Sequence, residues 1–349
     1  MKIVCFGEML LRLSPPGTAL LRQARELEMH FGGAEANVAA CVAQLGIEMG
    51  ADARVEAVLV SKVPANALGA AAVQFFHSLG VQTDRITRGG ERLGLYFVEN
   101  GVFPRPSEVV YDRKHSAITE ITGDEYDWDE ILRGAAWFHW TGITSALGAN
   151  VRMELLKACQ AAKSLGVKVS CDLNYRQKLW THEEARSAMI PLMKYVDCCI
   201  SNEQDAEICL GITRDGGGGN DDSYRQLAKQ LHEHFDFEYV ALSVRGGGVH
   251  KIPAGYIAKR AFIMDSAECS QGYYSKEYVY QPHEHIGGGD AFTGSLLYAL
   301  TVREDSKSAL EFAVAASVLK QTVPGDTPRF SVGEVRAFLS NSSSQTIVR

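Results

Sequence analysis

The chain has 349 residues, 46% of them hydrophobic and 22% charged, and its formal net charge is -7. An acidic chain without a cluster of Lys and Arg is a poor ligand for nucleic acid, so this class of partner is excluded. No apolar run approaches about 20 residues, and Glu8 and Arg12 interrupt the apolar N-terminus, so neither a membrane span nor a signal peptide is expected. The eight scattered cysteines contain no CxxC pair and indicate reduced thiols in a cytoplasmic protein.

Short apolar runs alternate with helical patterns along most of the chain. The N-terminal third predicts strands over 2–7 and 55–60 and helices over 34–45 and 67–79. After Trp137 the alternation resumes, with strands over 137–140, 167–172, 197–201 and 239–244, and helices over 151–165, 183–194, 224–235, 291–301 and 306–322. This pattern predicts an α/β fold with three α/β/α layers, in which helices cover both faces of a mostly parallel central sheet.

The segment 92–116 differs from this pattern because it contains no helical periodicity. Two strand-like runs, LGLYFVEN and SEVVYDR, flank the turn signal Asn100-Gly101, although Pro104 and Pro106 argue against a tight hairpin. We therefore expect a small antiparallel layer that projects from the α/β body.

Three consecutive glycines, Gly287, Gly288 and Gly289, precede Asp290 and a helical pattern that starts at Ala291. A glycine-rich turn at a helix start presents several unpaired backbone N–H groups, which together with the helix dipole form an anion site. Asp290 could simply cap the helix. The glycines also remove the side chains that would block a ligand, and we favour a functional carboxylate.

Other polar residues follow the predicted strands, at the edge where open α/β sheets bind ligands. They are Glu8, Thr141, Gly142, Asp172 to Arg176, Ser201 to Asp205 and Ser243 to Gly248. Taken singly, Asp172 and Asn174 could cap a turn, and Asn202 and Asp205 could begin an exposed helix. The glycine run at 215–222 follows no periodic strand, so we interpret it as a surface loop.

Phosphoryl transfer fits this set of residues, because it needs an anion cradle, a carboxylate for a metal ion and a base that orients the attacking hydroxyl. The Walker A pattern is absent. The dinucleotide fingerprint GxGxxG is also absent, since Cys5-Phe6-Gly7-Glu8 follows the first strand, and this disfavours an oxidoreductase.

Two stretches resemble the signatures of the ribokinase-like (PfkB) carbohydrate kinases. These are GGAEANVA, with Gly32, Gly33, Ala36 and Asn37, and IGGGDAFTGSLL. The resemblance runs from Lys2 to about Phe338 and implies one ribokinase-like domain over 1–349 with a lid formed by roughly 10–31 and 90–115. LGLYFVENG, VVYDRKHSA, DLNYRQKLW and TVPGD are similar to the branch that phosphorylates 2-keto-3-deoxygluconate.

The resemblance implies a set of site residues. Asp290 would be the catalytic base, at an ordinary pKa of about 3.9, and Gly287, Gly288 and Gly289 the anion hole. Residues implied to bind the sugar are Gly33, Asn37, Tyr96, Tyr111, Arg113, Asp172, Asn174, Arg176 and Asp326, with Arg176 also near the transferring phosphate. Residues implied to bind ATP are Asn202, Ser243, Arg245, Gly246, Gly248, Gly287 and Gly289, and Asn202 and Asp205 would hold Mg²⁺ through water. The arginines and tyrosines suit a substrate that carries a carboxylate.

The sequence departs from the family pattern at Glu284-His285, where relatives have Asp and a small residue that contribute to a site for a monovalent cation. This leaves a requirement for K⁺ open. Two alternatives also stay open, which are another sugar kinase such as a fructokinase and a catalytically silent protein that binds a sugar or nucleotide. The exposed edges of an antiparallel lid favour a homodimer formed through it.

Overall fold

The computed structural model describes residues 1–47, 54–213, 221–244, 252–266 and 271–341. Among these residues, ten strands form the central sheet in the order β13-β12-β11-β10-β9-β8-β1-β4-β5, with β14 paired to β12. The strands are β1 (Lys2–Phe6), β4 (Glu56–Val63), β5 (Ile86–Arg88), β8 (Ala135–Thr141), β9 (Lys168–Asp172), β10 (Cys198–Asn202), β11 (Tyr239–Val244), β12 (Ile257–Asp265), β13 (Tyr273–Tyr274) and β14 (Tyr278–Tyr280). The strands from β5 to β11 run parallel, whereas β12 runs antiparallel to β11.

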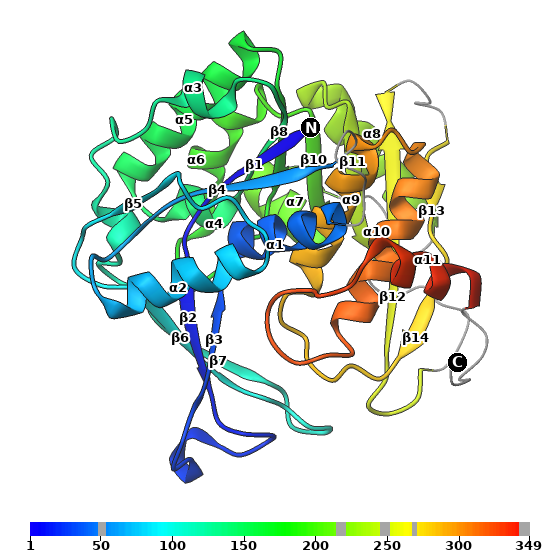
Figure 1. The fold of residues 1–349 in the computed structure, drawn as a ribbon. Helices are drawn as coiled ribbons and strands as arrows, with labels where there is room; N and C mark the ends of the chain where they lie inside the picture. Colours follow the sequence, from blue (N-terminus) through cyan, green and yellow to red (C-terminus); the bar gives the residue numbers. More distant parts are fainter. Residues whose placement is uncertain (48–53, 214–220, 245–251, 267–270, 342–349) are drawn as a thin grey trace.

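Helices cover both faces of this sheet, which confirms the predicted α/β/α layers (Figure 1). One face carries α1 (Ala34–Gly46), α2 (Ala67–Ser78), α9 (Gly288–Thr301), α10 (Ser306–Lys320) and α11 (Val332–Asn341). The other carries α3 (Trp128–Leu132), α4 (Gly142–Ala146), α5 (Ala149–Ser164), α6 (His182–Met193), α7 (Glu203–Leu210) and α8 (Asp221–Phe235). In β1 the four residues after Lys2 are all apolar, since Ile3 and Cys5 enter one core while Val4 and Phe6 enter the other.

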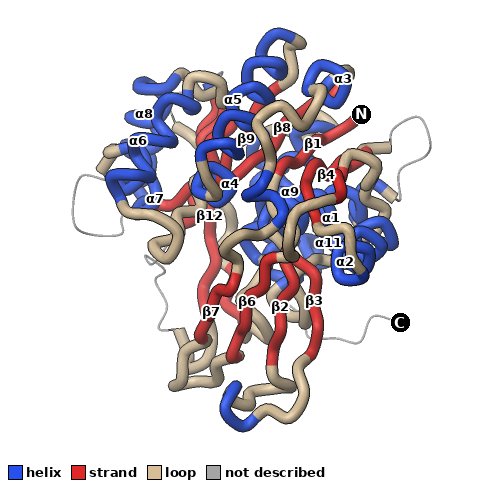
Figure 2. The backbone as a smooth tube through the Cα atoms, turned by 90° about the vertical axis from the view of Figure 1, so that its left-hand side faces the viewer, coloured by secondary structure: helices blue, strands red, loops and turns tan. Residues whose placement is uncertain are grey.

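A second sheet of four strands, here called the lid sheet, projects from one edge of the body (Figures 1 and 2). Its order is β3 (Glu28–Gly32), β2 (Leu10–Ser14), β6 (Gly94–Glu99) and β7 (Glu108–Asp112). The outer pairs are antiparallel, as expected, but β2 and β6 run parallel. Both strands follow parallel strands of the body, β1 and β5, so both leave the same edge in the same direction.

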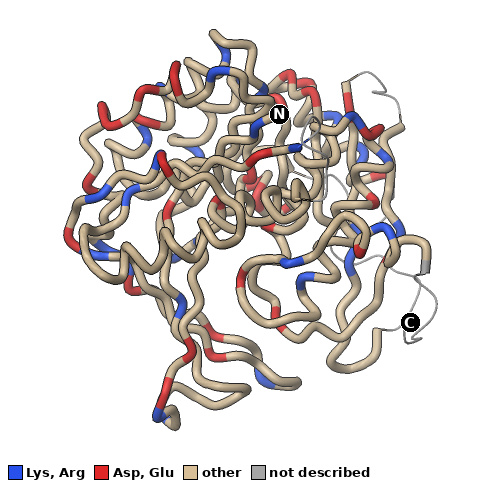
Figure 3. Tube along the Cα trace, viewed as in Figure 1, with Lys and Arg blue, Asp and Glu red and all other residues tan. Residues whose placement is uncertain are grey.

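No helix in the described ranges is long and apolar enough to cross a membrane. Lys and Arg are dispersed among Asp and Glu along the described chain (Figure 3). This distribution agrees with the absence of a basic cluster from the sequence.

Candidate active site

A cavity of about 640 Å³ lies between the lid sheet and the edge of the body sheet at which the parallel strands end. Of the residues selected from the sequence, it is lined by Gly33, Asn37, Tyr96, Tyr111, Arg113, Asp172, Asn174, Arg176, Asn202, Asp205, Ser243, Gly287, Gly289 and Asp290. Gly288 and Asp326 do not line it. Arg245, Gly246 and Gly248 lie outside the described residues. Segments far apart in the sequence therefore meet at one place, because the ends of parallel strands share one edge.

The glycine turn holds the N-terminus of α9 against the segment that follows α10. Gly287 precedes the helix with φ of 76°, and a Cβ atom there would lie 1.9 Å from the carbonyl oxygen of Asp326. A Cβ on Gly288 would lie 2.7 Å from the side chain of Gln321, whereas one on Gly289 would meet nothing within 4 Å. Tight packing therefore excludes side chains at the first two positions, and the third leaves open space at the cavity wall.

Asp290 belongs to the first turn of α9, which begins at Gly288 rather than at the expected Ala291. Gly287 occupies the position before the helix, so the interpretation of Asp290 as a cap is wrong. The amide of Asn37 donates a 2.7 Å hydrogen bond to the Asp290 carboxylate. Burial raises the pKa of Asp290 to about 7, against the opposing effects of this hydrogen bond and of Arg176. The ordinary pKa assumed from the sequence is therefore too low, and a carboxyl that titrates near neutral pH suits a general base.

Polar residues at and just after the ends of β9 and β10 line the same cavity. Asn202 caps α7 by accepting two 3.0 Å hydrogen bonds from the backbone, and Asp172 accepts one from the backbone N–H of Asn174 at 3.2 Å, so the capping interpretations hold. Burial, together with the nearby carboxylates of Asp205 and Asp290, raises the pKa of Asp172 to about 8. Mutual repulsion of three carboxylates is relieved by a bound cation.

These oxygen donors fit Mg²⁺. Among the described residues, no three His, Cys, Asp or Glu side chains come close enough to hold a metal ion directly.

The comparison with known proteins decides the family. The model of the pfkB family carbohydrate kinases matches residues 1–246. The chain belongs to the PfkB family of carbohydrate kinases.

Relatives of this kinase cover nearly its whole length. It is 33% identical to a 2-dehydro-3-deoxygalactonokinase of Haloferax volcanii, over 97% of this chain and 96% of the relative. It is 27% identical to a 2-dehydro-3-deoxygluconokinase of Thermoproteus tenax, over 93% and 89%. The solved structure of a 2-dehydro-3-deoxygluconokinase from Thermotoga maritima is 42% identical and superposes with a TM-score of 0.90, covering 98% of this chain and all of the other.

Arg113 reaches the cavity of the kinase from the end of the lid sheet. Its guanidinium pairs with the buried carboxylate of Glu8, a partner that the sequence did not indicate, and lies 5.7 Å from the ring centre of Tyr111. The Nε donor of Arg113 and the Oδ1 acceptor of Asn37 are buried and have no hydrogen-bond partner among the described residues. Both residues line the cavity, and an unpaired buried donor or acceptor favours a ligand that can pair with it.

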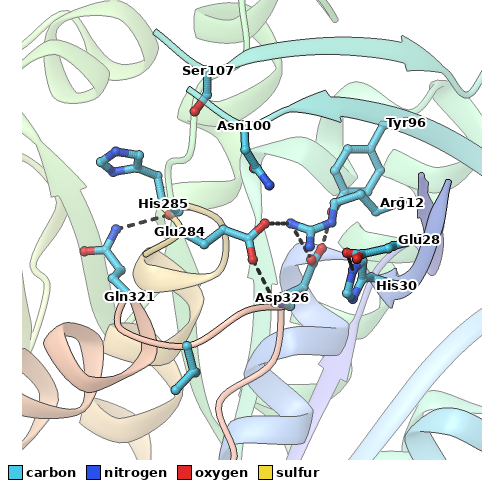
Figure 4. Close-up of polar contacts among 12 residues, drawn as sticks. Arg12, Glu28, His30, Tyr96, Asn100, Ser107, Glu284, His285, Gln321 and Asp326 are labelled. Atoms are coloured by element: carbon cyan, nitrogen blue, oxygen red, sulfur yellow. Dashed lines mark hydrogen bonds and ion pairs between the residues drawn. The ribbon is translucent and has the colours of Figure 1, made fainter. Parts of the chain in front are cut away.

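A buried ion cluster joins the lid sheet to the glycine turn (Figure 4). Arg12 of β2 pairs with Glu284 and, at 3.1 Å, with Asp326. Tyr96 of β6 donates to Asp326, and the backbone N–H of Gly325 donates to Glu284 at 2.7 Å. Both carboxylate oxygens of Glu284, where the sequence departs from the family pattern, are therefore paired, one with Arg12 and one with the backbone of Gly325. Asp326 does not line the cavity but accepts a hydrogen bond from Tyr96, which does.

Lys259 also lines the cavity but is not among the residues predicted from the sequence. Those residues follow predicted strands, whereas Lys259 lies near the start of β12. Because β12 runs antiparallel to β11, its first residues lie at the same edge as the ends of the parallel strands. A search that included residues before an antiparallel strand would have found it.

Proposed function

We propose that this kinase transfers the γ-phosphoryl group of ATP to the terminal hydroxyl of 2-keto-3-deoxygluconate. The main observation in support is the Asp290–Asn37 pair, which lies in a cavity between the glycine turn and the Arg113 end of the lid sheet. A base, an anion site and an arginine for a carboxylate are the three parts that this reaction needs.

On the sugar side, the unpaired Oδ1 of Asn37 accepts a hydrogen bond from a sugar hydroxyl, and the Nδ2 group of Asn37 holds the Asp290 carboxylate in place. Asp290 orients the terminal hydroxyl and takes its proton as the bond to phosphorus forms. The free Nε of Arg113 binds the carboxylate of the substrate. The lid sheet closes over the sugar and excludes water that would otherwise compete as acceptor.

On the nucleotide side, the backbone N–H groups of the glycine turn and the dipole of α9 stabilise the charge on the transferring phosphoryl group. Asn202 and Asp205, which line the cavity, would hold Mg²⁺ through water. When bound, Mg²⁺ neutralises phosphate charge that the carboxylates of the cavity would otherwise repel.

The proposal also specifies which epimer of the sugar acid, gluco or galacto, the kinase prefers. The relatives at 33% and 42% identity carry the names of a galactonate and a gluconate kinase, respectively, and both names describe 2-dehydro-3-deoxy acids. We assign the gluco epimer because the solved structure has the higher identity.

Release of ADP, measured over 2-keto-3-deoxygluconate, its galacto epimer, fructose, ribose and adenosine, tests the substrate. The highest kcat/KM is expected for the gluco acid. Activity on fructose alone would make the protein a fructokinase, and no turnover of any sugar would support a silent binding protein.

Asp290→Asn tests the mechanism, because Asn keeps the size and the hydrogen bond to Asn37 but cannot accept the proton. We expect turnover to fall by about 10²-fold or more, while calorimetry still detects binding of ATP and the sugar acid. Turnover close to that of the parent enzyme contradicts the assignment of the base.

We also propose that the kinase forms a homodimer through the lid sheet. Its edge strands β3 and β7 carry the exposed apolar side chains of Met29 and Val110, and Phe103 is exposed in the loop between β6 and β7. Strand edges with apolar side chains are sites of pairing with another chain. Light scattering of the purified enzyme is expected to give twice the chain mass, and Met29→Lys with Val110→Lys to give monomers. A monomeric parent enzyme rules the dimer out.

A further inference from the structure

Lys259 is a cationic side chain in the cavity to which the proposed mechanism gives no role. It lies near the start of β12, where the antiparallel register pairs Ser243 with Ala261 and so brings the start of β12 beside the end of β11. Neighbouring residues of a strand point to opposite faces. The side chain of Lys259 lines the cavity, whereas the Arg260 guanidinium stacks 4.2 Å from the ring centre of Tyr274.

The Lys259 ammonium has no ion-pair or hydrogen-bond partner in the described part of the chain. Burial lowers its pKa to about 8, and the negative charge of Asp290 opposes that decrease. The group is therefore still largely a cation at neutral pH. A partly buried cation without a protein partner costs free energy unless an anion binds beside it.

The position of β12 in the sheet indicates which anion binds. The lid sheet, with Arg113, is connected to the body through β1 and β5, at the opposite end of the sheet order from β12. The neighbours of Lys259 are the C-terminal end of β11, where Ser243 also lines the cavity, and the carboxylate of Asp290. The sugar carboxylate thus belongs near Arg113, and the region near Lys259 is left for the phosphates.

We propose that Lys259 is a catalytic residue that binds the phosphate oxygens of the nucleotide and stabilises the γ-phosphoryl group during its transfer. This inference rests on the proposed kinase reaction and adds a residue to it. Lysine suits the role because its ammonium is a compact charge on a flexible stem, which can follow a group that moves from donor to acceptor. It also offsets the carboxylates of Asp172, Asp205 and Asp290, which repel a polyphosphate.

Lys259→Met removes the charge and keeps most of the volume, and Lys259→Arg keeps the charge. Calorimetry with ATP, ADP and adenosine is expected to show ATP and ADP binding weakened about tenfold to hundredfold in Lys259→Met, with adenosine unaffected. Lys259→Arg should recover part of the loss. Steady-state rates should show a lower kcat and a higher KM for ATP, with the KM for the sugar acid unchanged.

Arg260→Met is the matched control, because it removes a cation from the adjacent position on the opposite face of β12, and its ATP affinity should equal that of the parent enzyme. Unfolding temperatures equal to that of the parent enzyme show that the variants fold. If Lys259→Met does not fold, Lys259→Gln takes its place.

Two results overturn the proposal. One is an ATP affinity within twofold of the parent enzyme together with an unchanged kcat. The other is a raised KM for the sugar acid with unchanged ATP binding, which would assign Lys259 to the substrate carboxylate. Nucleotide binding needs no sugar, so failure of the parent enzyme to phosphorylate any keto acid refutes the proposed substrate and leaves the binding result on Lys259 valid.

Discussion

Replacing Arg12 by Met tests whether the buried ion cluster holds the lid sheet to the glycine turn. Arg12 is 1% exposed and pairs with Glu284 and Asp326, which are both buried. Removing one partner of a buried ion pair leaves an uncompensated charge and costs about 3–5 kcal/mol. With an unfolding entropy of about 2.1 cal/mol/K per residue, a chain of 349 residues should lose roughly 4–7 °C in Tm.

Arg92→Met is the matched control, because it removes an arginine–aspartate pair from the same lid sheet at the surface. The Arg92 and Asp112 side chains are 33% and 51% exposed and lie 2.9 Å apart. Such a pair contributes about 0–1 kcal/mol, which corresponds to at most roughly 1.4 °C. Differential scanning calorimetry of the three proteins measures both values. A loss in Arg12→Met no larger than that in Arg92→Met refutes the role of the cluster.

The pH dependence of the loss identifies the uncompensated charge. Burial raises the pKa of Asp326, and Arg12 opposes that effect, so Asp326 should have a still higher pKa in Arg12→Met. A carboxyl whose pKa is higher in the folded than in the unfolded state takes up a proton more readily when folded, and acidification then favours the folded state. The deficit of the variant should therefore be larger at pH 8 than at pH 5.5. A deficit that does not change with pH would point to lost packing instead.

Two further predictions concern the glycine turn and the base. Gly289→Ala adds a methyl group to open space at the cavity wall, so Tm should stay within about 1 °C while kcat/KM for ATP falls about tenfold. Gly287→Ala places a methyl group against a carbonyl oxygen at a φ of 76° and should lower Tm. Equal effects of the two variants on Tm and on kcat/KM would contradict these different roles. Because Asp290 must be ionised to act as a base and its pKa is about 7, kcat/KM for the sugar acid should rise with pH up to about 7 and level off above it. A rate that is constant between pH 5 and pH 7 would show an ordinary acidic pKa.

Much of the fold follows from local pattern. The run from Ile3 to Phe6 is apolar at every position because both faces of its strand are buried, and this pattern predicts a parallel sheet between helical layers. The ligand edge follows as well, since polar residues after β9, β10 and β11 must meet where parallel strands end. The glycine turn before Asp290 could also be predicted from the sequence, because its residues are contiguous and stand at the start of a helix.

Pairing between distant segments could not be derived in this way. The partner of Arg113 is Glu8 and the partners of Arg12 are Glu284 and Asp326, and no spacing in the sequence relates these positions. The parallel register of β2 and β6 depends on where both strands leave the body.

Charge states were likewise decided by the tertiary structure. The pKa of Asp290 near 7 and that of Asp172 near 8 arise from burial and from the carboxylates that share the cavity. Lys259 enters the cavity only because β12 turns back along β11. The sequence by itself determined the family, the layers and the glycine turn with its aspartate, since these depend on contiguous residues. The partners of each charge, and hence the chemistry available at pH 7, depend on which segments come together across the fold.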